Sequence, residues 1–129
     1  MPMTTYLENA LLDATLKATT YTGPANVYMA LYSTTNSQAT PGTELTGNGY
    51  SRQSTPFATS AALGIIQNTG NVSFTASGGA WTTAVSAAIM DASTSGNMLY
   101  FNNAMPAQTV NDGDTLTYET GQVTITISA

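Results

Sequence analysis

The sequence has no cysteine and no histidine, and only two of its 129 residues, Lys17 and Arg52, carry a positive charge. Without cysteine there are no disulfides, thiol nucleophiles or thiolate metal ligands. Without histidine, the commonest general base and transition-metal ligand is missing. Two cations are too few to neutralise a row of phosphates or to anchor a chain on an anionic membrane. We therefore expect no cofactor, no bound metal, no nucleic-acid partner and no membrane partner.

Charged residues of either sign make up only 7% of the chain, against about 25% in an ordinary soluble domain. Much of the polarity comes from uncharged residues, above all threonine, which suits the half-exposed face of a strand better than a helix. A surface with few charges loses little hydration energy when it is covered. This composition favours a protein that works inside an assembly, and it leaves open a neutral, threonine-rich secreted domain.

The sequence pattern predicts neither a membrane-spanning helix nor a signal peptide. No apolar run approaches the roughly 20 residues that a membrane helix needs. Residues 1–5 lack the basic and apolar regions of a secretion signal. We expect a soluble product of the cytoplasm, folded as a single domain over residues 1–129, which is long enough for a modest core without disulfides.

The first predicted element is a helix over residues 5–18. Thr5 and Glu8 have the spacing of a capping box, in which each side chain accepts a hydrogen bond from the other residue's backbone amide. Leu7 and Leu11 recur at helical spacing and begin an apolar stripe on one face.

The rest of the chain predicts eight or nine short strands separated by turns. A long loop over residues 33–49 interrupts the series. The turns at residues 69–71 and 95–97 each predict a hairpin between the flanking strands. This spacing favours a mainly β fold, a two-sheet antiparallel β-sandwich or jelly roll of about eight strands with an N-terminal α-helix. The predicted strands cover residues 27–32, 50–55, 63–68, 72–75, 85–91, 98–101, 107–110, 116–118 and 122–128.

The acidic residues do not form a recognisable catalytic group. Asp112 and Asp114 are a close pair that could hold a hard cation, but the segment lacks the spacing and the terminal glutamate of a calcium loop. The same residues are ordinary turn formers. Glu44, Asp91 and Glu119 are scattered along the chain, whereas glycoside-type acid–base chemistry needs carboxylates that face each other in a cleft. We predict that the chain is not an enzyme.

The aromatic residues allow three interpretations. Tyrosine and tryptophan stack on sugars, anchor protein interfaces and fill cores. We predict core positions for Phe57, Phe74 and Phe101, and we favour one for Trp81. Our interface candidates are apolar and aromatic residues together with two charged residues, Glu44 and Arg52. The full set is Leu7, Leu11, Tyr28, Tyr32, Glu44, Tyr50 and Arg52.

Arg52 has two equally supported roles. It follows the long loop and lies close to Tyr50, and arginine and tyrosine are the residue types most often found at binding hot spots. The alternative is that Arg52 pairs with Glu44 across the loop.

An ordered set of segments runs through the chain at residues 6–13, 21–32, 42–53, 80–85, 89–92, 96–100 and 109–116. This set resembles a widespread family of small tailed-phage virion proteins. No single segment is specific, but the set covers almost the whole chain. Members are commonly labelled tail-fibre proteins, and jelly-roll proteins of similar size act as cement or decoration proteins on phage capsids, often as dimers or trimers.

The resemblance implies a structural protein of the virion with no catalytic residues. Our leading hypothesis is a capsid decoration or cement protein, a homo-oligomer that bridges and stabilises major capsid subunits by binding only the assembled shell. The alternative is a tail-fibre or adhesin subunit that binds host surface glycans through exposed tyrosine and tryptophan. A polysaccharide-degrading enzyme is a third, weaker possibility. The predicted helix and residues 33–49 are the candidate contact segments.

Overall fold

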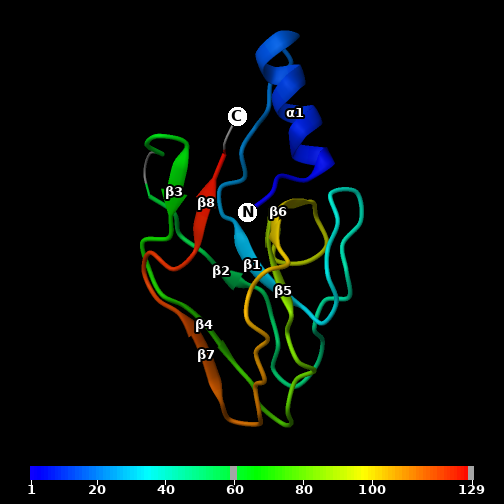
Figure 1. Ribbon diagram of the computed structural model, residues 1–129, viewed down its shortest axis with the longest axis vertical. Coiled ribbons are helices and arrows are strands. Elements are labelled where there is room, and N and C mark those ends of the chain that lie inside the picture. The colour runs from blue at the N-terminus through cyan, green and yellow to red at the C-terminus, as the bar shows by residue number, and fades with distance from the viewer. Residues whose placement is uncertain (59–60, 128–129) are drawn as a thin grey trace.

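The fold is mainly β, with a helix at the N-terminus, as the sequence predicts. A computed structural model describes residues 1–58 and 61–127. Figure 1 shows an elongated molecule with the helix at one end of its long axis. In these residues the elements are α1 (Thr5–Leu16), β1 (Tyr28–Tyr32), β2 (Gln53–Ser54), β3 (Ile65–Gln67), β4 (Val72–Thr75), β5 (Ser86–Met90), β6 (Met98–Asn102), β7 (Thr115–Tyr118) and β8 (Thr124–Thr126).

A four-stranded antiparallel sheet in the order β2-β1-β5-β6 forms the centre. All of β5 and four of the five residues of β1 are buried, because both faces of the sheet are covered. The predicted hairpin across residues 95–97 is confirmed, since β5 pairs with β6. The free edge of β6 is covered by the chain's own N-terminus, where Met3 bridges Tyr100. Such cover prevents the edge from pairing with another chain.

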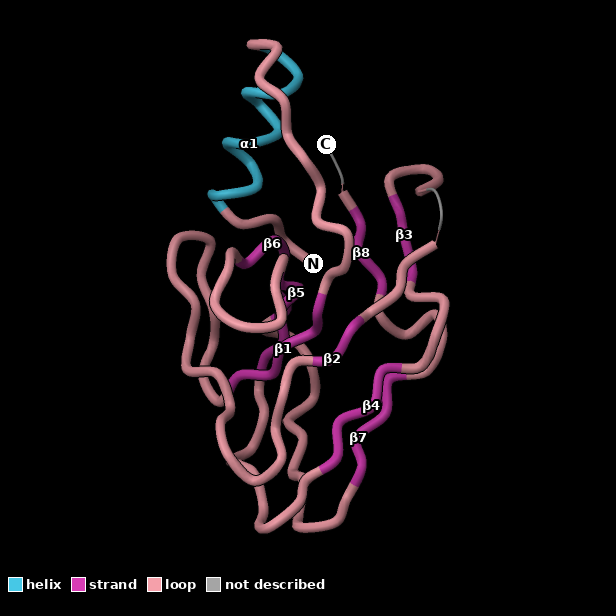
Figure 2. Tube along the Cα trace, turned by 180° about the vertical axis from the view of Figure 1, so that it is seen from behind, coloured by secondary structure: helices cyan, strands magenta, loops and turns pink. Residues whose placement is uncertain are grey.

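Two separate two-stranded ribbons, β3 with β8 and β4 with β7, form the second layer. Figure 2 shows both ribbons on one side of the molecule and long loops on the other. The predicted hairpin between β3 and β4 is therefore wrong. Each of these strands pairs instead with a strand from the C-terminal part of the chain. Of the last predicted strand, residue 128 lies outside the described residues.

The buried side chain of Asn68 explains the pairing that the sequence missed. Its Oδ1 accepts hydrogen bonds from the backbone amides of Gly121 and Val123, both at 2.9 Å. Its Nδ2 donates to the carbonyls of Gly70 at 2.8 Å and Glu119 at 3.1 Å. Asn68 is 2% exposed, so leaving these groups unpaired would be costly. The side chain ties the predicted turn to a distant segment and prevents a local hairpin.

The main core lies between the central sheet and the ribbons. Phe74, which is completely buried, stacks with Tyr50 at a ring-centroid distance of 6.3 Å. Trp81 meets Tyr50 edge-on at 5.5 Å, and its indole Nε1 donates to the Asn48 carbonyl at 2.8 Å. The predicted core positions of Phe74 and Trp81 are confirmed, and Phe57 packs against this cluster from its margin. The buried members are Met29, Leu31, Leu45, Val72, Phe74, Ala76, Trp81, Ala84, Ala87, Ile89, Val110, Val123 and Ile125.

The opposite face of the sheet carries a smaller cluster, and loops cover it in place of a second sheet. The cluster includes Tyr32, Met90, Met98 and Phe101, so Phe101 is also a core residue. Thr4 Oγ1 donates to the Met98 carbonyl at 2.6 Å and so brings the start of α1 onto this face. Met90 and Met98 of this cluster also line a hollow, which is described below.

Helix α1 is shorter than predicted and capped differently. Its N-cap is Thr4, whose Oγ1 accepts from the Leu7 amide at 3.4 Å, and the helix ends at Leu16. The Thr5–Glu8 capping box does not form, because the Thr5 amide donates to the Gln38 carbonyl at 3.0 Å and Glu8 Oε1 accepts from Gln38 Nε2 at 3.0 Å. Thr4 is favoured because the same hydroxyl anchors the helix to β6, a tertiary contact that no local spacing reveals.

Candidate functional site

The Arg52 side chain holds two loops together. Its Nε and Nη2 donate to the two carboxylate oxygens of Glu44, both at 2.9 Å. Its Nη1 donates to the carbonyls of Ala92 at 2.9 Å and Ser95 at 2.7 Å. The Arg52 side chain is only 9% exposed, and bidentate charge-assisted pairs of this kind are the strong ones. The pairing that was one of the two predicted roles of Arg52 is confirmed.

Tyr50 joins this ion pair to the central sheet. Its hydroxyl donates to Glu44 Oε2 at 2.8 Å and accepts from the backbone amide of Leu31 in β1 at 3.0 Å. Burial, together with the hydrogen bond to Glu44, raises the pKa of Tyr50 far above its ordinary value of 10.0. Glu44, Tyr50 and Arg52, three of the predicted interface residues, therefore form one structural cluster, which we call the Arg52 clamp.

The other interface candidates are spread over the molecule. Leu7 and Tyr32 are 3% and 2% exposed, so their side chains belong to the interior and offer no surface to a partner. Tyr32 Oη lies 3.5 Å from Met90 Sδ in the smaller cluster. Leu11 and Tyr28 are half-buried.

The acidic pair Asp112 and Asp114, in the turn that precedes β7, holds backbone amides in place. Asp112 Oδ1 accepts from the Gly78 amide at 3.0 Å, and Asp114 Oδ2 accepts from the Asn111 amide at 3.2 Å. Asp114 thus performs the turn role that was one of the two predicted roles of the pair, whereas Asp112 connects this turn to the backbone at Gly78. Within residues 1–58 and 61–127, no group of three or more acidic side chains is placed to hold a metal ion. In the same part of the chain, no helix has the length and apolar character needed to cross a bilayer.

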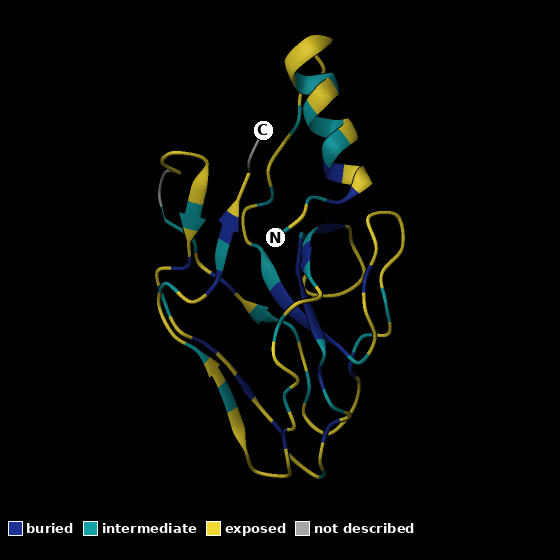
Figure 3. Ribbon diagram, in the orientation of Figure 1, coloured by how far each residue is buried: buried dark blue, intermediate teal, exposed yellow. Residues whose placement is uncertain are grey.

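The exposed large apolar side chains belong mostly to α1 and to the β3–β8 ribbon. Both elements lie in the upper half of the molecule in Figure 1. We call Leu12, Leu16, Leu63, Ile65 and Ile127 the apolar end. Their exposed fractions run from 39% for Ile65 to 98% for Leu63. Figure 3 shows the outer turns of α1 as largely exposed, projecting away from the body. The predicted apolar stripe of the helix is therefore only partly covered by the chain itself.

Leu63 is the most unusual residue of this end. It occupies a two-residue turn with Gly64, closed by hydrogen bonds between Ala62 and Ile65 at 3.0 and 3.1 Å. Its φ of 56° is left-handed, a conformation that asparagine and glycine adopt far more readily than leucine. The sequence pattern placed Leu63 at the start of a strand and missed this turn. The glycine that follows Leu63 was the one local signal for it.

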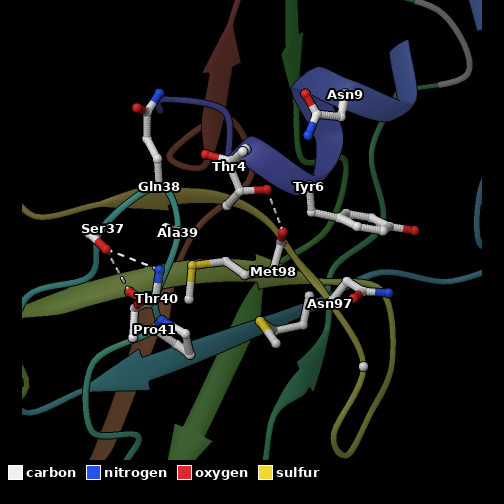
Figure 4. A pocket seen from close by; sticks show the side chains of 13 residues that line it. Thr4, Tyr6, Asn9, Ser37, Gln38, Ala39, Thr40, Pro41, Asn97 and Met98 are labelled. Atoms are coloured by element: carbon white, nitrogen blue, oxygen red, sulfur yellow. Dashed lines mark hydrogen bonds between the residues drawn. The ribbon is translucent and has the colours of Figure 1, made fainter. Parts of the chain in front are cut away.

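A hollow of about 400 Å³ lies at the base of α1 (Figure 4). Residues 37–41 of the long loop form one side, and Tyr6, Asn9 and Asn97 form the other. Met98 lies between the two sides. Met90 is also among the lining residues. A second hollow of about 320 Å³ lies over the Arg52 clamp. The β5–β6 loop contributes residues to both hollows.

A charge-poor β protein with a projecting helix and a bare apolar end has the features of an assembly subunit. A family model described as podophage GP4 fiber I protein gp80 matches residues 2–126. The match covers nearly the whole chain, so the chain belongs to this family and is a structural protein of a phage virion. The predicted resemblance to phage virion proteins is confirmed. No curated protein matches the chain.

Replacing the two cations one at a time tests the importance of the Arg52 clamp. We expect Arg52→Ala to lower the free energy of unfolding by about 3 kcal/mol, because Glu44 loses its partner in a partly buried site. Lys17→Ala is the matched control. Lys17 lies 3.8 Å from Asp13 with side chains 74% and 49% exposed, so the change should stay within about 0.5 kcal/mol. Urea unfolding of both variants measures the difference, and equal effects would contradict the assignment.

Two buried tyrosines predict a loss of stability at high pH. Burial raises the pKa of Tyr32 from 10.0 to about 12, and the pKa of Tyr50 also rises. Above pH 10 the unfolded chain releases these protons while the folded chain keeps them. The free energy of unfolding should therefore fall by at most about 1.4 kcal/mol per pH unit for each tyrosine between pH 10 and 12.

Urea titrations at several pH values measure this slope, with Tyr32→Phe as the comparison. The variant lacks one titrating group, so its slope between pH 10 and 12 should be shallower than that of the parent chain. Identical slopes would mean that the Tyr32 hydroxyl reaches solvent in the folded protein.

Proposed function

We propose that the chain is a subunit of a phage fibre and that it docks through its apolar end onto another virion protein. The role is structural and involves no catalysis. Two independent observations support it: the family description names a fiber protein, and the apolar end offers large side chains that the chain leaves uncovered.

Leu63 carries the docking part of the proposal. A leucine with left-handed backbone costs on the order of 1–2 kcal/mol, and this one is 98% exposed, so its side chain gains nothing from burial in the chain. Burial of the side chain in a partner would stabilise the complex by about 1.5–3 kcal/mol. The turn positions Leu63 as an anchor for a pocket on that partner.

Helix α1 supports the same surface. Its 12 residues are close to the length below which an isolated helix is marginal in water. Leu7 is its buried residue, near the first turn, whereas Leu12 and Leu16 of the outer turns are 55% and 77% exposed. A partner that covers Leu12 and Leu16 would stabilise the helix and gain apolar contact in the same step.

Capsid decoration, the leading hypothesis from the sequence, uses the same kind of docking. A shell protein would place the apolar end against major capsid subunits, whereas a fibre subunit would place it against a tail or fibre protein. The family description, which names a fiber protein, favours the fibre. The two roles differ in copy number, because a protein that coats the shell approaches the number of major capsid subunits and a fibre subunit stays far below it.

Leu63→Asn separates docking from folding. Asparagine adopts left-handed backbone easily, so we expect the isolated variant to be as stable as the parent chain or slightly more stable. In virions assembled with the variant, we expect the amount of this protein per particle to fall severalfold, because the anchor is lost. Quantitative mass spectrometry of purified particles measures this amount relative to the major capsid protein.

Thr109→Asn, at an exposed position away from the apolar end, is the control and should leave incorporation unchanged. Full incorporation of Leu63→Asn would reject the docking surface. A parent copy number close to that of the major capsid protein would reject the fibre in favour of the shell.

A further inference from the structure

The hollow at the base of α1 has the size and lining of a small-molecule site. Its volume of about 400 Å³ falls within the roughly 300–1,000 Å³ of ligand pockets. Met90 and Met98, 4% and 8% exposed, form an apolar floor. Tyr6 stands at its margin with 43% of its surface exposed, beside the exposed Asn9. Figure 4 shows these groups on the side opposite residues 37–41.

Hydrogen bonds within the two bordering loops hold the walls in place. In the long loop, the Ser37 amide donates to the Thr40 carbonyl at 2.9 Å, and the Thr40 amide donates to Ser37 Oγ at 3.0 Å. In the β5–β6 loop, the Asn97 amide donates to Asp91 Oδ1 at 2.6 Å. Gly96 packs so closely on that carboxylate that a Cβ would collide with it. A site with fixed walls pays less entropy when a ligand binds.

The charge pattern around the hollow selects a neutral ligand. Among the described residues that line it, none carries a charge. The two nearby carboxylates are occupied, since Glu8 Oε1 accepts from Gln38 Nε2 at 3.0 Å and Asp91 Oδ2 accepts from Asn97 Nδ2 at 3.1 Å. With a net charge of -5 and no cation at the site, a phosphate or carboxylate ligand would be repelled.

We propose that this hollow binds a neutral saccharide. The half-exposed Tyr6 ring offers an apolar face for the CH groups of a sugar ring. The Asn9 side chain supplies an amide donor and an acceptor for sugar hydroxyls. Gln38 and Asn97 supply their amide oxygens as acceptors, since their amide nitrogens already donate to Glu8 and Asp91. The apolar floor removes water from beneath the ring. Trp81, which the sequence offered as a stacking residue, is buried and plays no part. The proposal does not depend on where in the virion the chain docks, because none of the residues that line the hollow belongs to the apolar end.

Nuclear magnetic resonance titration of the full chain tests the site with defined probes. Glucose, galactose, rhamnose and N-acetylglucosamine are the neutral sugars, and glucuronate and glucose 6-phosphate are their charged counterparts. We expect at least one neutral sugar to shift the amide signals of Gln38 and Asn97 with millimolar affinity. The charged probes should bind at least about fivefold more weakly, because no cation faces them.

Matched variants identify the residues responsible. Tyr6→Ala and Asn9→Ala should each weaken binding at least about fivefold, whereas Tyr6→Phe should retain it because the ring remains. Asn26→Ala, at an exposed asparagine outside the hollow, should bind like the parent. Absence of shifts with all four neutral sugars, equal binding of the charged probes, or parent-like binding by Tyr6→Ala would each overturn the proposal.

Discussion

The Arg52 clamp is the interaction on which the loop-covered side of this protein depends. The chain has two cations, and Arg52 places its charge against Glu44 and the carbonyls of the β5–β6 loop. Through Tyr50 the same group reaches the backbone of β1 and the stacked rings of the main core. One side chain thus connects the central sheet, the long loop and the β5–β6 loop. Other hydrogen bonds also hold the long loop, among them the Asn36 side chain on Ser86 Oγ at 3.1 Å, but the Arg52 side chain is the one that joins this loop to the β5–β6 loop at Ala92 and Ser95.

The sequence predicts what depends on local pattern and misses what depends on distant partners. Turn residues were enough for the β5–β6 hairpin, and residue type was enough to favour a core position for Trp81. The β3–β4 hairpin failed because Asn68 bonds to residues about fifty positions away. The cap of α1 shifted to Thr4 because its hydroxyl also bonds to β6. In both cases a single polar side chain makes a tertiary bond that outweighs a plausible local one.

The same contrast between local pattern and tertiary packing applies to the candidate surfaces. Glu44, Tyr50 and Arg52 could be grouped from their neighbourhood in the sequence, although they turn out to stabilise the fold. Leu63 and Tyr6 could not be singled out, because the exposed fraction of a side chain follows from packing and not from residue type. The composition did predict a surface with few charges. The structure concentrates uncovered apolar side chains at one end and an uncharged hollow near the same helix.

An electron cryomicroscopy reconstruction of the phage particle, resolved well enough to fit this chain, tests most directly how it is used. We predict that the chain lies in a fibre, with Leu63 and the outer turns of α1 buried against a different virion protein. The β4–β7 ribbon should face solvent or a neighbouring copy. A reconstruction in which the apolar end is bare, with the contact made elsewhere, would contradict the proposed docking surface. A position spread over the capsid shell would contradict the fibre.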